Sequence, residues 1–187
     1  MQYWFWYFLV YSFLGFCLET AYAAATRAPR RGRKCFLLLP LCPVYGLAMT
    51  IVVALVPPDW PFVPAAVAGA LICTGTEYGV HWFYQTLFAV RFWDYSALGL
   101  NLKGRVCLRF SAAWGVLSAL GLRLVQPQLV LLADAIPLPV SAWMWLLFTA
   151  DCALSGVVLL QYHDTALLSL PAAVRQLRAS SQSSTSR

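Results

Sequence analysis

Three acidic residues of this chain lie inside long apolar stretches, where an ionisable side chain is costly. They are Glu19, Glu77 and Asp151. A charged side chain at the centre of a bilayer costs about 2.5–3.5 kcal/mol on insertion scales, so it is normally paired, faces a cavity or carries function. The three acids therefore predict a polar site inside a membrane, and we expect them to lie at a similar depth.

The stretch around Glu77 also predicts a helix with one small-to-polar face. Residues on this face recur every four positions: Ala65, Gly69, Cys73, Glu77, His81 and Gln85. Small residues let a neighbouring helix approach closely. Glu77 and His81 are one helical turn apart, so they could share a proton, ligate a metal ion or form a structural hydrogen bond. We predict an intramembrane polar site of Glu19, Glu77, His81 and Asp151, with no assigned catalytic residue, no resident metal and no cofactor.

The elements that would position these residues are transmembrane helices. The chain has 187 residues, of which 61% are hydrophobic and only 11% charged, so apolar stretches dominate it. A helix needs about 20 apolar residues to cross a bilayer, and five stretches reach that length: 3–25, 36–56, 62–85, 106–125 and 139–161. We predict an all-α polytopic membrane bundle of about five transmembrane helices over 1–161. A cytoplasmic tail over 162–187 should follow, with a disordered, Ser-rich end.

The basic residues predict the orientation of the bundle. With five spans, every Lys and Arg except Arg123 falls on one side of the membrane, and cytoplasmic loops are the ones that retain Lys and Arg. We therefore expect a multi-pass protein of the cell membrane with its N-terminus outside and its C-terminus inside. This asymmetry also explains the net charge of +6 without nucleic acid. The partners we expect are membrane lipids, a separate ATPase or other membrane subunit, or a second copy of the chain.

The second stretch carries a break in its helical pattern. Pro40, Pro43, Tyr45 and Gly46 lie within seven residues at its entrance. Proline removes a backbone donor and disrupts the preceding turn, so this broken-helix segment should be kinked or unwound. Such backbone is tolerated in a membrane only where protein or a water-filled cavity covers it. Broken helices often line transporter sites, although a proline kink that only shapes packing is an equal alternative.

A charged, aromatic loop is expected on the inner side between the third and fourth spans. It holds an inner-loop charge cluster of Arg91, Asp94, Asn101 and Arg105. Asp94 has Arg91 and Arg105 as candidate partners. The mixture of aromatic and charged residues is suited to the membrane interface.

The order of several short motifs resembles that of a known family. The motifs are Tyr11-Ser-Phe-Leu-Gly-Phe-Cys-Leu-Glu19, Leu39-Pro-Leu-Cys-Pro-Val-Tyr-Gly46, Thr76-Glu-Tyr78, Trp93-Asp-Tyr-Ser96, Asn101-x-x-Gly-Arg105 and Ser111-x-x-Trp-Gly115. Together they resemble the Putative ABC-transporter permease type IV family of small bacterial membrane proteins, from about residue 3 to residue 160. The chain departs from that pattern at Leu39, where the family has Gly. The resemblance implies a polytopic membrane protein and supplies neither a substrate nor catalytic residues.

Three functions are compatible with these features. The first is a transporter or permease-like subunit whose internal site holds the acids; the chain has no phosphate-binding loop motif, so ATP-driven action would need a separate polypeptide. The second is a membrane-embedded lipid-modifying enzyme, with Glu77 and His81 as acid and base and with Arg91, Lys103 and Arg105 on a phosphate. The third is a structural or assembly subunit in which the acids pair with Arg105, Arg109 or a partner's charges.

Overall fold

The protein is an all-α membrane bundle, as the apolar stretches predict. The computed structural model describes residues 2–26 and 35–168, so the predicted disordered end of the tail lies outside the described residues. The helices are α1 (Gln2–Ala25), α2 (Pro43–Leu55), α3 (Phe62–Leu87), α4 (Leu108–Leu120), α5 (Gln126–Ala135) and α6 (Leu138–Tyr162). A π-helical segment, η1 (Gly121–Val125), joins α4 to α5. Four helices of the described chain are long and apolar enough to cross a membrane.

The second apolar stretch contains only a short helix. Residues 35–42 are not helical and bend at 35–40, and α2 begins at Pro43 and has 13 residues. At 1.5 Å per residue, α2 is about 20 Å long, which is shorter than a membrane-crossing helix. Proline at the first helical position needs no backbone donor there, so the helix starts at Pro43, after the part of the stretch 36–56 that the prolines predict to be kinked or unwound.

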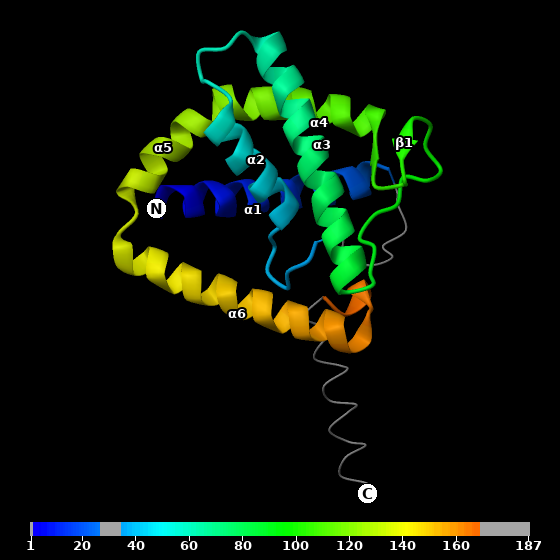
Figure 1. The fold of residues 1–187 in the computed structure, drawn as a ribbon. Coiled ribbons are helices and arrows are strands. Elements are labelled where there is room, and N and C mark those ends of the chain that lie inside the picture. Colours follow the sequence, from blue (N-terminus) through cyan, green and yellow to red (C-terminus); the bar gives the residue numbers. More distant parts are fainter. Residues whose placement is uncertain (1, 27–34, 169–187) are drawn as a thin grey trace, which may run out of the picture.

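The fourth apolar stretch forms a longer helix than its composition predicts. α4, η1 and α5 together make one run from Leu108 to Ala135 of 28 residues, which continues past the predicted end at residue 125. Pro127 lies in the first turn of α5, directly after the π-helical segment. A π turn is a local irregularity that accommodates a missing backbone donor. The proline therefore bends this run without ending it, and Figure 1 shows the change of direction between α4 and α5.

Small residues bring pairs of helices into close contact. α3 packs on α4, where a side chain added at Gly69 would meet Ser118 and one added at Gly115 would meet Ala66. α1 packs on α2 in the same way, because Gly15 lies against the ring of Tyr45. The predicted face of α3 from Ala65 to His81 is buried throughout. These contacts fix α1 to α2 and α3 to α4 as two close pairs.

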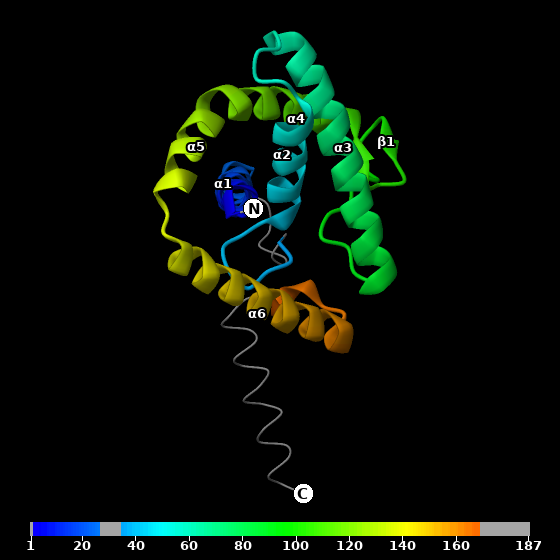
Figure 2. The ribbon, with the colours of Figure 1, turned by 60° about the vertical axis from the view of Figure 1, so that its left-hand side comes forward.

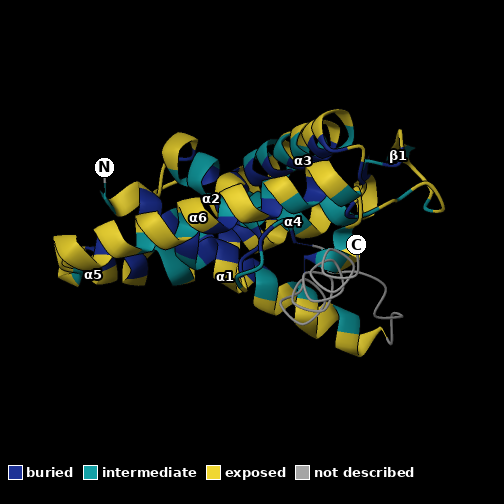
Figure 3. Ribbon diagram, turned by 90° about the horizontal axis from the view of Figure 1, so that it is seen from below, coloured by how far each residue is buried: buried dark blue, intermediate teal, exposed yellow. Residues whose placement is uncertain are grey.

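The remaining helices surround α1. In Figure 2, which looks along α1, this helix lies between α2 and α5, with α4 on one side and α6 on the other. The ring of Phe5 on α1 stacks on Trp145 of α6 at 4.1 Å between centroids. Exposed residues line the outer faces of the helices in Figure 3, and many are large and apolar, such as Leu71, Leu124 and Trp143. Such a surface is suited to contact with lipid tails.

A short hairpin follows α3. β1 (Asn101–Leu102) pairs antiparallel with β2 (Val106–Cys107), with Asn101 opposite Cys107. Figure 1 shows the hairpin beside the N-terminal end of α4, on the side where α1 ends. A single 3-10 turn, η2 (Thr165–Leu167), follows α6. The hairpin is part of the segment that closes one end of the candidate site described next.

Candidate functional site: a cavity between α1 and α4

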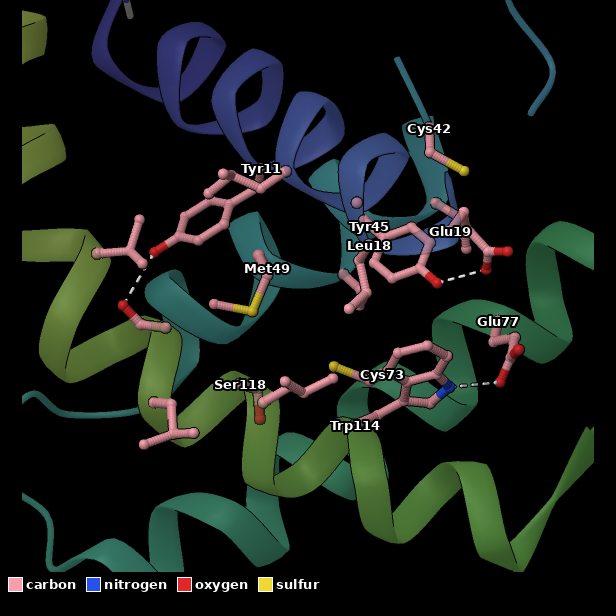
Figure 4. A pocket seen from close by; sticks show the side chains of 18 of the residues that line it. Tyr11, Leu18, Glu19, Cys42, Tyr45, Met49, Cys73, Glu77, Trp114 and Ser118 are labelled. Carbon is pink, nitrogen blue, oxygen red and sulfur yellow. Dashed lines mark hydrogen bonds between the residues drawn. The ribbon is translucent and has the colours of Figure 1, made fainter. Parts of the chain in front are cut away.

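A cavity of about 310 Å³ lies between α1 and α4, with walls from α2, α3, η1 and the loop after α3. Its aromatic lining residues are Tyr11, Tyr45, Trp93, Tyr95 and Trp114. Glu19 and Glu77 also line it, and among its described lining residues there is no Lys, Arg or His. Figure 4 shows the two glutamates at one end of the cavity and Tyr11 at the other. The cavity therefore has one acidic, aromatic end.

Glu77 is held at that end by two aromatic side chains. Its Oε1 accepts a hydrogen bond from the Tyr95 hydroxyl at 2.9 Å, and its Oε2 accepts one from the Trp114 indole Nε1 at 3.1 Å. Glu77 itself is only 7% exposed. Burial and the nearby Glu77 carboxyl raise the pKa of the Tyr95 phenol, so Tyr95 stays protonated and serves as a donor. Both carboxyl oxygens of Glu77 thus have partners from side chains of the cavity wall.

Glu19 lies across the same end on α1 and is less completely bonded. The Tyr45 hydroxyl donates to its Oε1 at 2.6 Å, as Figure 4 shows. No described residue donates to its Oε2. The ring of Tyr45 meets the ring of Trp114 edge to face, 5.2 Å between centroids. The aromatic contact therefore joins the two glutamate sites into one wall, and within the described part of the chain Glu19 has Tyr45 as its hydrogen-bond donor.

The loop between α3 and α4 brings Tyr95 and Trp93 to the cavity. Asn101 stabilises its turn by accepting from the Gly104 amide at 3.0 Å, and the Tyr95 amide donates to the Gly104 carbonyl at 2.8 Å. Gly104 has a φ of +68° and faces Asp94 and Ser96 closely, so a side chain would not fit there. The loop is therefore built to hold Tyr95 in one position.

Arg105 and Asp94 of the predicted charge cluster serve this loop separately. Arg105 donates to the Tyr78 hydroxyl at 2.9 Å and to Gln85 Oε1 at 3.1 Å, which ties the loop to α3. Asp94 pairs instead with Arg91, at 3.6 Å on the exposed surface. Asp94 also accepts from the hydroxyl and the amide of Ser96, and these bonds lower the pKa of its carboxyl. Of its two candidate partners, Asp94 therefore contacts Arg91.

His81 makes a different contact from the one its spacing to Glu77 suggests. Its Nε2 lies 3.1 Å from the carbonyl oxygen of Trp93, and its Nδ1 has no hydrogen-bond partner among the described residues. The oxygens of Glu77 are occupied by Tyr95 and Trp114. His81 is not among the residues that line the cavity. Its contact with the backbone helps to position Trp93, whose ring it meets at 5.3 Å.

Asp151 lies outside the cavity and contacts the bent segment 35–42. Its Oδ1 accepts from the Leu38 amide at 3.0 Å and from the Ser155 hydroxyl at 3.1 Å, while its Oδ2 accepts from the Leu39 amide at 2.9 Å. These amides belong to backbone without a helix, which must find acceptors inside a membrane. Of the four residues predicted for the polar site, the cavity thus contains Glu19 and Glu77.

The predicted broken-helix segment divides between the cavity and its supports. Tyr45, in the first turn of α2, lines the cavity, whereas Pro40, Pro43 and Gly46 do not. A side chain at Gly46 would meet Ser12 and the Phe8 carbonyl of α1. Gly46 therefore allows α2 to approach α1 closely enough for Tyr45 to reach Glu19.

The cavity opens toward the lipid-facing surface between α1 and α4. The residues at this opening are leucines that are 38–67% exposed: Leu14, Leu18, Leu117, Leu120 and Leu124. Side chains of α1 bound the opening at each end, through a contact with α5 at one end and with α4 at the other. Tyr11 donates to Gln126 Oε1 at 3.1 Å at one end, and Tyr22 meets Phe110 edge to face at the other. The opening is therefore a bounded apolar gap.

Sequence reasoning missed several residues of the site, three of which lie in the loop after α3 or on α4. Trp93, Tyr95 and Trp114 line the cavity, yet none was expected there from helical spacing. A signal was present, because each belongs to one of the short motifs that carry the family resemblance: Trp93-Asp-Tyr-Ser96 and Ser111-x-x-Trp-Gly115. Aromatic side chains with a polar atom are suited to the boundary between apolar walls and a carboxylate.

Comparison with known proteins agrees with the membrane architecture. The family model described as Putative ABC-transporter type IV matches residues 6–157. This range includes the helices α2, α3 and α4 and both glutamates of the cavity. No curated protein and no solved structure matches the chain significantly. Because the match extends over most of its length, the chain belongs to the Putative ABC-transporter type IV family.

Proposed function

We propose that this protein is the membrane-spanning component of a transporter, and that the cavity between α1 and α4 holds the transported solute. The observation that carries the proposal is the pair of glutamates, Glu19 and Glu77, in one cavity of about 310 Å³. Ligand sites of this size combine apolar walls with a few polar groups. The proposal keeps the orientation expected from the basic residues, with the N-terminus outside and the C-terminus inside the cell membrane.

The bent segment before α2 supports the transport function. Transporters commonly bind their substrates where a helix is interrupted inside the membrane. Here the interruption at 35–42 ends at α2, and Cys42, Val44 and Tyr45 line the cavity. The sequence contains no phosphate-binding loop motif, so the proposal includes a separate ATPase as its partner if ATP drives transport.

The contacts give less support to a lipid-modifying enzyme. That function needs Glu77 and His81 near one reacting group, but their hydrogen bonds go to different partners. It also needs Arg105 on a phosphate, whereas Arg105 is bonded to Tyr78 and Gln85. The Asp151 contacts support a structural role for that residue alone. We therefore favour transport, with Asp151 as a support of the fold.

The test compares Glu77→Gln with a matched control in the native host lacking its own copy of the protein. The control is Asp59→Asn, which makes the same chemical change in an exposed loop outside the cavity. Solutes in cells and medium are profiled by mass spectrometry at equal protein levels. We expect at least one solute to be redistributed by the wild type and by Asp59→Asn, and not by Glu77→Gln. Identical profiles for wild type and Glu77→Gln would contradict the proposal.

A further inference from the structure

The charge of the cavity indicates the sign of its ligand. Glu19 and Glu77 are the acidic lining residues, and the groups that bond them are neutral hydroxyl and indole donors. Among the described lining residues no basic side chain balances them. The N-terminus of α2 also reaches this wall and carries only a partial positive charge. A ligand with a full positive charge would complete the site.

The aromatic lining distinguishes an organic cation from a metal ion. The faces of Trp and Tyr rings attract cations, and this attraction is strongest when water is excluded. Tyr45, Tyr95 and Trp114 surround the two carboxyl groups. A metal ion instead needs several hard or thiolate ligands around one point. Within residues 2–26 and 35–168, no three His, Cys, Asp or Glu side chains are grouped to hold one.

The opening indicates that the ligand also has an apolar part. Exposed leucines of α1, α4 and η1 border the gap, and Met49 and Ala48 continue the apolar lining inward. A purely hydrophilic ion would meet mostly leucine side chains at this entrance. A molecule that partitions into the bilayer could pass the leucines and place its charged end between the glutamates.

We propose that the cavity binds an organic ammonium cation with an apolar part, which enters from the bilayer through the gap between α1 and α4. This inference rests on the proposed function, because it names the class of solute that the same cavity holds. The cationic end contacts Glu19 and Glu77 and the rings of Tyr45 and Trp114. The apolar part extends toward Tyr11, whose position at the other end of the cavity is visible in Figure 4.

The test uses radiolabelled benzyltrimethylammonium and the purified full chain in phosphatidylglycerol nanodiscs. Equilibrium dialysis, corrected with empty discs, measures binding to the wild type, Glu77→Gln, Glu19→Gln and the control Asp59→Asn. We expect saturable binding to the wild type and the control. Each glutamine variant should bind about tenfold more weakly or worse, because a charge contact at an aromatic site is lost. Size-exclusion chromatography verifies that each variant remains folded.

A neutral competitor tests recognition of charge without any substitution in the protein. Neopentylbenzene has the shape of benzyltrimethylammonium with carbon in place of nitrogen, so it should not displace the label. Displacement equal to that by unlabelled cation would overturn the inference, as would the absence of saturable binding. Adding phosphatidylcholine to the discs distinguishes two sources of the same chemistry. Competition would identify a lipid headgroup as the cation, no competition would identify a free cation, and both support the proposed class.

The two proposals can fail separately. Cation binding that depends on Glu77, in a protein that redistributes no solute, would uphold the ligand class and contradict transport. A Glu77-dependent redistribution of anionic or neutral solutes, without cation binding, would uphold transport and overturn the ligand class.

Discussion

Asp151 and Glu77 are both buried acids within helices, yet they bond to different kinds of donor. Their exposed fractions are nearly equal, 6% and 7%. Asp151 accepts from two backbone amides of the segment 35–42, whereas Glu77 accepts from the side chains of Tyr95 and Trp114. Of these two acids, Glu77 lines the cavity and Asp151 does not. Burial alone therefore does not identify a functional acid in this protein.

The two carboxyl groups differ in whether the hydrogen bonds they accept can rearrange. A backbone amide cannot change its role as a donor, and inside a membrane it must have an acceptor. The Tyr95 hydroxyl can rotate and either donate or accept. The bonds of Asp151 thus maintain the chain path, whereas those of Glu77 can rearrange when a ligand binds. Four predictions test this contrast, beginning with the largest expected effect.

Asp151→Ala should destabilise the protein more than the cavity substitutions Glu77→Gln and Tyr95→Phe. It removes the acceptor of the Leu38 and Leu39 amides, and an unsatisfied buried donor costs about 1–3 kcal/mol each. The midpoint of unfolding by sodium dodecyl sulfate in mixed micelles measures the effect. Ser155→Ala removes only the side-chain donor to Asp151 and serves as the milder control. Equal unfolding midpoints for wild type and Asp151→Ala would contradict the structural role of Asp151.

Replacing each acid by its amide sharpens the contrast. In Asp151→Asn, the new NH₂ group faces a backbone donor, so one bond is lost at a cost of about 1–3 kcal/mol. In Glu77→Gln, the amide oxygen can accept from Trp114 while the NH₂ group donates to the Tyr95 oxygen. The free energy of unfolding should therefore change by less than about 1 kcal/mol. The same detergent titration compares both variants. A larger loss of stability in Glu77→Gln than in Asp151→Asn would contradict the structural role of Asp151 and assign that role to Glu77.

Tyr95→Phe should have a moderate effect confined to the cavity. It removes the hydroxyl that donates to Glu77 Oε1, which should cost about 1 kcal/mol of stability. It should also weaken benzyltrimethylammonium binding, because the Glu77 carboxyl is then held by Trp114 alone. Tyr162→Phe, at the end of α6 and outside the cavity, is the control. Unaltered binding in Tyr95→Phe would show that the loop does not position Glu77.

Asp94→Asn should have the smallest effect, and that effect should depend on pH. Asp94 bonds a backbone amide as Asp151 does, but on the exposed surface. Because its folded pKa is lowered, its contribution is complete above the unfolded pKa of about 3.9 and is lost as the pH falls through the folded pKa. Hydrogen exchange over residues 94–104 should therefore be faster in Asp94→Asn at pH 7, with the difference disappearing in acid. A difference in exchange rate that is the same at pH 7 and in acid would contradict this account.

Much of the fold follows from local sequence patterns. The spacing of Ala65, Gly69 and Cys73 predicts the face of α3 that packs on α4, because that contact repeats with the helix itself. The prolines at 40 and 43 likewise predict the interruption before α2. The predicted helix end at residue 125, just before Pro127, is wrong. The apolar pattern does not predict the π-helical segment that precedes this proline and lets the helix continue to Ala135.

The site is harder to predict from the sequence than the fold, because its contacts join residues that are far apart in the chain. Asp151 bonds amides 113 and 112 residues earlier in the chain, and the helical pattern contains no information about such a pairing. Tyr95 donates to Glu77 from the loop after α3, where its own amide is bonded to the carbonyl of Gly104, nine residues later. Helical spacing makes Glu77 and His81 neighbours, but it does not determine which atoms their side chains contact.

The bent segment 35–42 also couples two distant parts of the protein mechanically. The Leu38 and Leu39 amides are bonded to α6, and the Cys42 amide donates to the Ser12 carbonyl of α1 at 2.9 Å. Tyr45 and the wall beside Glu19 follow three residues later. A displacement of α6 would therefore pull on the backbone leading to the cavity, so a partner that binds α6 could alter ligand affinity without touching the ligand.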